Sequence, residues 1–230
     1  MNFYIIVEGE KTEMSVYPAW LSLLAPNYTR IENFDDVNEN NYYIFCGGGI
    51  PSIYTHVTNA VLDINEINSK EGPHYDYLLV CLDTEDENRD YIMQQIENQL
   101  KSKGVSLLNA ELLVFEQKIC METWFLGNQS VFKDNPQDSE YLDFIKYYNV
   151  GQNNPEEMGN MNPDRFATAA RFHLRYLQQM LEERNMSYSK RNTHAVQKQT
   201  YLQQLIRRYE ETGHIATFGS WYEFVKAHFK

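Results

Sequence analysis

The chain has 230 residues, of which 43% are hydrophobic and 23% are charged, an ordinary balance for a globular protein with a sizeable core. Its net charge of −12 at pH 7 argues against a protein that coats nucleic acid, because phosphate contacts need clustered Lys and Arg. No apolar run reaches the roughly 18 residues of a membrane span, and the N-terminus has no basic region before a long apolar stretch. We therefore expect a soluble, cytoplasmic protein with no membrane partner.

Apolar runs alternate with helical patterns in the first half of the chain, which predicts an α/β fold with a four-stranded parallel, doubly wound sheet and flanking helices. The expected strands are residues 3–7, 42–46, 77–82 and 110–115. The expected helices are residues 11–24, 53–67 and 89–103. Asp86 or a neighbour is expected to cap the third helix, and Gly104 to end it. Residues 27–41 are polar and predict a surface loop.

The pattern changes after the fourth strand. A short helix or turn is expected at residues 120–126, followed by a polar, partly helical excursion over residues 127–163. Asp164 is expected to cap the next helix, and a further helix is expected over residues 196–209. We therefore predict a first domain at residues 1–127 and a mostly helical C-terminal extension at residues 128–230.

Two of the expected strands end in carboxylates. Glu8 follows the first strand and precedes Gly9, where the chain must turn, while Asp83 and Glu85 follow the third. Ligands bind at the carboxyl ends of such strands, and a hard cation relieves the repulsion between gathered carboxylates. The pattern therefore predicts a site for Mg²⁺ or a similar ion. Each acid taken alone could simply cap the following helix.

Charge is unevenly distributed along the chain. Residues 161–230 contain 11 Lys and Arg and 6 Asp and Glu, a net of +5, which leaves −17 for residues 1–160. This indicates an acidic catalytic part and a basic part that faces the substrate, or else a solvated helical surface rich in Arg. Lys190, Arg191 and Lys198 lie in a polar stretch of the basic part, where they are either phosphate contacts or solvated charges.

Other site types lack their usual motifs. Cys46, Cys81 and Cys120 have no metal-like spacing, and the six histidines form no H-E-x-x-H pattern, so a zinc site is not expected. The three glycines Gly47–Gly49 match neither a Walker A loop nor G-x-G-x-x-G, which favours a plain tight turn.

The stretch Val7-Glu8-Gly9-Glu10-Lys11-Thr12-Glu13, read with the acids after the third strand, resembles the Toprim domain of bacterial and phage-defence nucleases, in particular the OLD-like and RloB-like types. The segment Cys120–Leu126 is similar to an element that these proteins carry after the fourth strand. The ending Gly213–Phe218 also resembles C-terminal signatures of small members. The resemblance covers residues 1–127 well and the remainder loosely.

The resemblance implies a Mg²⁺- or Mn²⁺-dependent nuclease that cleaves DNA or RNA in phage defence, alone or as the effector of a complex. Glu8, Glu13, Asp83 and Glu85 would hold the metal, with Glu8 and Asp83 as catalytic residues and Glu8 also as general base. The implied supporting residues are Gly9, Asp86 and Glu122. Lys190 would neutralise charge in the transition state, and Arg191 and Lys198 would contact nucleic acid.

Two other functions fit the same residues. One is a non-catalytic Toprim-like subunit that binds a partner ATPase or nucleic acid. The other is a phosphate-binding response domain with a single Mg²⁺ in an acidic pocket. A partner ATPase and a homodimer are both compatible with the nuclease interpretation, since an acidic chain that binds nucleic acid gains from a basic partner.

Overall fold

A computed structural model describes residues 1–85 and 87–230 of the chain. The chain divides into two compact units. The first unit comprises residues 1–82, 87–116 and 224–230, and the second comprises residues 83–86 and 117–223. Asp86, predicted to support the metal site, lies outside the described residues.

A parallel sheet forms the centre of the first unit. Within the described residues it has five strands in the order β2-β3-β1-β4-β5. Their bounds are β1 (Phe3–Val7), β2 (Thr29–Ile31), β3 (Asn41–Cys46), β4 (Tyr77–Asp83) and β5 (Glu111–Gln117). Strand β1 runs parallel to both β3 and β4, and its Val7 lies opposite Cys46 and Cys81. The predicted α/β class is therefore confirmed.

The prediction of four strands is wrong, because β2 is a fifth strand inside the segment expected to be a loop. Strand β2 has only three residues, none of them buried, so it carries no periodic apolar signal. It forms because Thr29 N donates to Asn40 O over 2.9 Å and the strand then pairs in parallel with β3. The same segment contains the 3₁₀ helix η1 (Phe34–Asp36).

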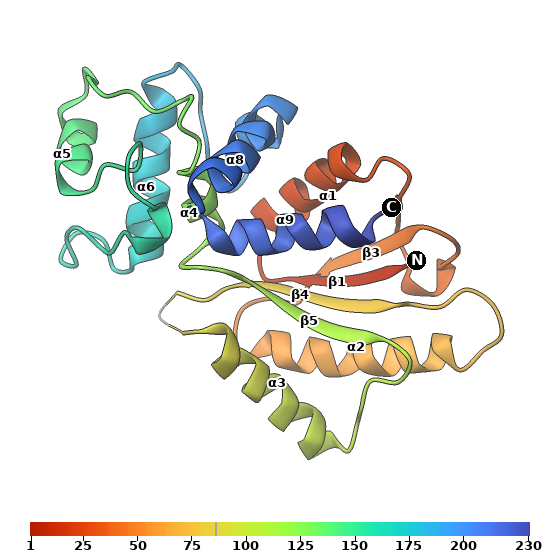
Figure 1. Ribbon diagram of the computed structural model, residues 1–230. Coiled ribbons are helices and arrows are strands. Elements are labelled where there is room, and N and C mark those ends of the chain that lie inside the picture. The colour runs from red at the N-terminus through yellow and green to blue at the C-terminus, as the bar shows by residue number, and fades with distance from the viewer. Residues whose placement is uncertain (86) are drawn as a thin grey trace. The chain divides into compact units, whose positions relative to one another are not determined.

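Helices cover both faces of the sheet (Figure 1). One face carries α2 (Ser52–Asn68) and α3 (Arg89–Lys103), and the other carries α1 (Thr12–Leu24) and the end of α9 (Ala216–His228). Alternate side chains of the strands, such as Tyr4 and Ile6, pack in one apolar core with α2 and α3. On the other face, Phe3 stacks on Phe229 with ring centroids 3.7 Å apart. A sheet buried on both faces explains the continuous apolar runs of its strands.

The ends of α3 follow local rules. Asn88 caps the helix, since its Oδ1 accepts from Tyr91 N over 2.9 Å, so a neighbour of Asp86 performs the capping expected there. Gly104 ends the helix with a φ of 65°, a left-handed conformation that glycine adopts without steric cost.

The described part of the second unit is mostly helical. It contains α4 (Met121–Phe125), α5 (Ser139–Tyr147), η2 (Pro155–Glu157), α6 (Ala169–Glu182), α7 (His194–Gln197), α8 (Gln199–Thr212) and the start of α9. Helix α8 begins three residues later than predicted, because α7 forms a separate turn before it. None of the described helices combines the length and the apolar character needed to span a lipid bilayer.

The predicted cap of α6 is wrong. The helix begins at Ala169, and Thr168 caps it by accepting from Arg171 N over 3.2 Å. Asp164 instead lies in a turn that Asn162 closes, because Asn162 Oδ1 accepts from the backbone N–H groups of Asp164 and Arg165. Asp164 and Thr168 are both suitable capping residues. Because Asp164 is part of the turn at Asn162, the helix begins after Thr168 instead.

A buried glutamate holds the start of α9. Glu156 has only 3% of its surface exposed, and its carboxylate accepts hydrogen bonds from Ala216 N at 2.9 Å and Thr217 N at 3.0 Å. These donors belong to the first turn of the helix, whose N–H groups have no partner within the helix. The Gly213–Phe218 segment therefore has a structural role within the second unit.

Candidate functional site

The predicted site residues divide between the two units. Glu8 and Glu13 belong to the first unit, whereas Asp83, Glu85, Glu122 and Lys190 belong to the second. Of these, Glu85, Glu122 and Lys190 line one pocket within the second unit.

In the first unit, the backbone N–H and carbonyl of Glu8 are hydrogen-bonded to residues of both strands that neighbour β1. Glu8 N donates to Cys81 O over 3.1 Å, and Glu8 O accepts from Cys46 Sγ over 3.1 Å. Its carboxylate lies over the glycine turn after β3, since a Cβ at Gly49 would approach Glu8 Oε1 to 3.4 Å. Glu8 is therefore a half-buried side chain that follows a buried strand directly, as predicted.

Glu13 lies against Gly9. A Cβ at Gly9 would overlap the Glu13 carboxylate, so the absence of a side chain at residue 9 makes room for it. Glu13 has 6% of its surface exposed and lies near the buried Cys81. Burial raises the pKa of the Cys81 thiol to about 12, with a smaller contribution from the Glu13 charge, so this cysteine is an inert thiol at neutral pH.

In the second unit, two loops pair backbone to backbone beside Asp83. Thr84 N donates to Gln117 O at 3.1 Å, and Glu85 N donates to Ile119 O at 3.2 Å. Asp83 Oδ1 accepts from Met121 N at 3.1 Å, at the start of α4. Asp83 thus positions the helix that carries Glu122.

Two residues of these loops have unusual backbone conformations. Glu85 has a φ of 41° and Ile119 a φ of 70°, and both values lie in the left-handed region that favours glycine. Such a conformation is costly for a β-branched residue such as Ile119, and residues held in this way often occur at functional sites.

Glu122 is a buried acid with a fixed orientation. Its surface is 2% exposed, and its Oε1 accepts from the hydroxyl of Tyr188 over 2.9 Å. The Tyr188 ring in turn packs edge-on against Phe125, with centroids 5.7 Å apart. Glu122, which the sequence predicted as a supporting residue, thus lines a pocket. Tyr188 holds one oxygen of its carboxylate.

The pocket has a volume of about 470 Å³ and combines both signs of charge. Its charged and hydroxyl-bearing lining residues are Glu85, Glu122, Thr168, Arg171 and Lys190. Two carboxylates and two cationic side chains around one cavity suit a ligand that carries both anionic oxygens and a cation, such as a phosphate with a bound metal ion.

Lys190 and Arg191 form the tip of a two-residue turn. Ser189 and Asn192 exchange backbone hydrogen bonds of 3.1 and 2.9 Å on either side of that tip. Lys190 lines the pocket, whereas Lys198 lines a different cavity of about 200 Å³ beside Asn128 and Ser130. Lys190 and Lys198 thus line different cavities of the second unit, and Arg191 lies next to Lys190 at the turn.

Sequence reasoning missed Arg171 and Thr168. Both lie at the start of α6, where Thr168 is the capping residue and Arg171 follows in the first turn. The excess of basic residues over 161–230 pointed to this region, and the local signal was Thr168, a capping residue directly before the periodic apolar residues of α6.

The donors of the pocket fit a hard divalent cation. Carboxylate oxygens are what Mg²⁺ prefers, and it is usually held by one or two carboxylates together with substrate phosphates and water. Within residues 1–85 and 87–230, no three or more His, Cys, Asp and Glu side chains are grouped so as to hold a metal ion. A cation in this pocket would thus share its ligands between the chain and a phosphate.

Comparison with known proteins finds no matching family model, curated protein or solved structure.

Proposed function

We propose that this chain is a metal-dependent nuclease that hydrolyses phosphodiester bonds of DNA or RNA. One observation carries the proposal: a single pocket of the second unit is lined by the carboxylates of Glu85 and Glu122 and by the cationic side chains of Arg171 and Lys190. Three of these four residues were predicted from the sequence as part of a phosphate-cleaving site.

The chain's own residues have distinct tasks in this proposal. Lys190 and Arg171 bind the non-bridging oxygens of the phosphate, and Arg171 can do so with two parallel hydrogen bonds. Tyr188 fixes Glu122 through one oxygen, and a carboxylate can accept through its second oxygen as well. Glu85 is exposed and can accept a proton from a water molecule.

A bound Mg²⁺ or Mn²⁺ would supply charge neutralisation on the phosphate and a more acidic water molecule. Glu85 and Glu122 are the pocket residues that would hold it. Asp83 stays a predicted ligand, although one of its oxygens already accepts from Met121 N. Glu8 and Glu13 of the first unit stay predicted ligands on the sequence argument.

The proposed role in phage defence, with a partner ATPase or a homodimer, rests on the family resemblance alone. The cationic side chains of the pocket support a phosphate-bearing partner, whether DNA, tRNA or another RNA.

Cleavage of plasmid DNA and total tRNA with Mg²⁺ or Mn²⁺ tests the proposal. We expect metal-dependent cleavage that falls at least about 100-fold in Glu85→Gln, Glu122→Gln and Lys190→Ala, the usual loss when charge stabilisation in a transition state is removed. Glu97→Gln and Lys101→Ala are matched controls, since both are exposed charged residues on α3 and neither lines the pocket.

Two results would contradict the proposal. The first is cleavage that persists in all three pocket variants. The second is a wild-type protein that binds nucleic acid or a partner ATPase and cleaves neither substrate with either metal, which would favour the non-catalytic subunit.

A further inference from the structure

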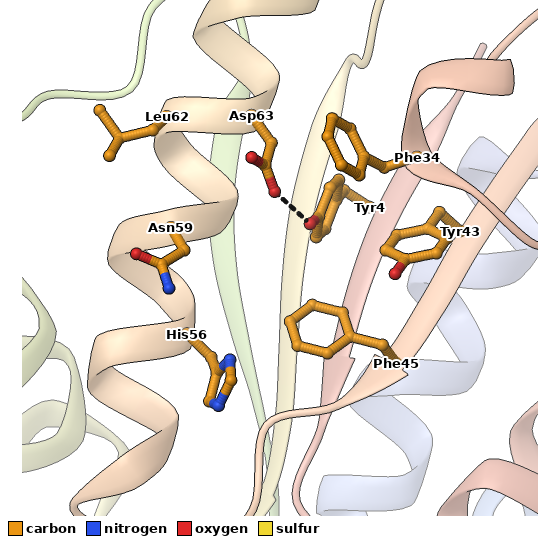
Figure 2. Close-up of a pocket in the computed structure, with 8 residues that line it drawn as sticks. All are labelled: Tyr4, Phe34, Tyr43, Phe45, His56, Asn59, Leu62 and Asp63. Carbon is orange, nitrogen blue, oxygen red and sulfur yellow. Dashed lines mark hydrogen bonds between the residues drawn. The ribbon is translucent and has the colours of Figure 1, made fainter.

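Another cavity lies entirely within the first unit, and the proposed nuclease does not use it. It has a volume of about 420 Å³, within the range of small-molecule sites. Figure 2 shows side chains from the sheet, from η1 and from α2 around it. Those that matter here are Tyr4, Phe34, Tyr43, Phe45, His56 and Asp63.

The local geometry of each element explains why these side chains meet. Tyr43 and Phe45 are two residues apart on β3, so both point to the same face of the sheet, and Tyr4 of β1 points to that face as well. His56 and Asp63 are seven residues apart on α2, which is two helical turns, and they therefore share a side of that helix.

The Tyr4 ring stands at a steep angle to its neighbours on β3. The Tyr4 ring is 5.9 Å from Phe45 at an interplanar angle of 89°, and 5.0 Å from Tyr43 at 71°. Tyr43 and Phe45 are close to parallel, at 26°. Phe34 packs against Tyr43 at 6.2 Å. The rings thus form a corner rather than a parallel slot, and a corner suits a compact, rounded group better than a flat base.

Asp63 supplies the negative charge of the cavity. Its Oδ2 accepts from the hydroxyl of Tyr4 over 2.8 Å, the bond drawn in Figure 2. Among the described residues that line the cavity, none is Lys or Arg. Burial raises the pKa of the Asp63 carboxyl, the hydrogen bond from Tyr4 partly offsets this effect, and the nearby Glu66 charge adds to it.

We propose that this cavity binds a small organic ammonium ion. The faces of aromatic rings carry negative potential and attract a cation, and a carboxylate beside them adds direct charge attraction. An anionic ligand fits poorly, because a nucleotide would bring its phosphate towards Asp63 with no Lys or Arg of the lining to compensate. The site depends on neither the metal nor the nuclease pocket.

Calorimetric titration of the full chain tests the proposal with choline and its uncharged isostere 3,3-dimethylbutan-1-ol. These two probes differ in charge and hardly in shape. We expect choline to bind in a saturable way below about 10 mM and the alcohol to bind at least about tenfold more weakly. A peptide that contains trimethyllysine presents the same quaternary ammonium group as part of a protein. Binding of either probe supports a site for an organic ammonium ion. The probe that binds more tightly shows whether the natural ligand is a small molecule or a modified protein.

Variants locate the binding in this cavity. Asp63→Asn removes the charge and keeps an oxygen that can accept from Tyr4, and Phe45→Leu removes a ring and keeps an apolar side chain. We expect each to weaken choline binding at least about tenfold. Asp90→Asn, at an exposed acid on α3, is the matched control and should bind as the wild type does.

The proposal is overturned if choline and the alcohol bind equally, if choline does not saturate, or if guanosine monophosphate binds more tightly than choline. It is also overturned if both folded variants retain wild-type affinity. Circular dichroism establishes folding, and Phe45→Leu carries the test should Asp63→Asn fail to fold.

Discussion

The hydroxyl of Tyr188 donates to Glu122 Oε1 over 2.9 Å, and both side chains are almost completely buried, at 5% and 2% exposure. This bond joins α4 to the segment that leads into the Lys190 turn. It therefore couples the orientation of one pocket acid to the position of one pocket cation.

Tyr188→Phe should destabilise the protein by about 1.5–3 kcal/mol, the usual loss for a hydrogen bond to a charged group in a buried site. We also expect reduced metal-dependent cleavage, because Glu122 loses the contact that orients it. Urea denaturation and the plasmid assay measure the two effects. Tyr91→Phe is the control, since Tyr91 is 43% exposed and should change stability by less than about 0.5 kcal/mol. Equal stability of the two variants would refute the coupling.

His173 should make stability depend on pH. The side chain is fully buried between Thr123, whose hydroxyl lies 2.8 Å from Nδ1, and the backbone oxygen of Met158, 2.9 Å from Nε2. A carbonyl only accepts, so Nε2 carries the proton, and Nδ1 accepts from Thr123. Burial lowers the pKa of His173 to about 4 from its ordinary 6.5.

The folded protein disfavours the charged imidazole. The contribution of neutral His173 to the free energy of unfolding is therefore fully present above pH 6.5 and is lost as the pH falls towards 4. The loss should amount to about 3 kcal/mol in full, of which about 2 kcal/mol falls between pH 7 and pH 4.5. Urea denaturation at pH 7 and pH 4.5 measures it. His173→Gln should shrink the difference between the two pH values, whereas His194→Gln, at an exposed histidine, should leave it as in the wild type. An unchanged difference in His173→Gln would refute the assignment.

Arg208 should be a major source of stability in the second unit. It is 1% exposed, and its guanidinium donates to the backbone oxygens of Val150, Gly151 and Asn153 and to Nδ1 of His214. Arg208→Met should cost about 3–5 kcal/mol, because the buried carbonyls lose their donors.

Its neighbour supplies the control. Arg207 is exposed and pairs with Glu211 one helical turn later, so Arg207→Met should cost less than about 1 kcal/mol. Thermal denaturation of both variants decides the matter, and similar melting temperatures would contradict the role given to Arg208.

Gly219 allows α8 and α9 to approach closely. A Cβ at this position would overlap the ring of Tyr209. Gly219→Ala should therefore cost about 1–3 kcal/mol through overpacking. The double variant Gly219→Ala, Tyr209→Ala should recover part of that loss relative to Tyr209→Ala alone, as a double-mutant cycle would measure. Additive costs would show that the two residues do not interact.

The amino-acid sequence by itself determined the features that depend on neighbouring residues. The alternation of strands and helices, the bounds of α3 and its Gly104 end follow from local periodicity and backbone preference. The position of Glu8 directly after a buried strand follows in the same way.

Tertiary structure alone decided the features that depend on distant partners. Strand β2 exists because β3 offers it hydrogen bonds, and Arg208 is buried because backbone oxygens some 55–58 residues earlier in the chain receive its protons. Arg171 joins Glu122 at one pocket through the packing of α4 and α6. The physical reason is that a hydrogen bond or a cavity depends on where its groups lie in space. Local sequence patterns do not determine the distance between groups that are far apart in the chain.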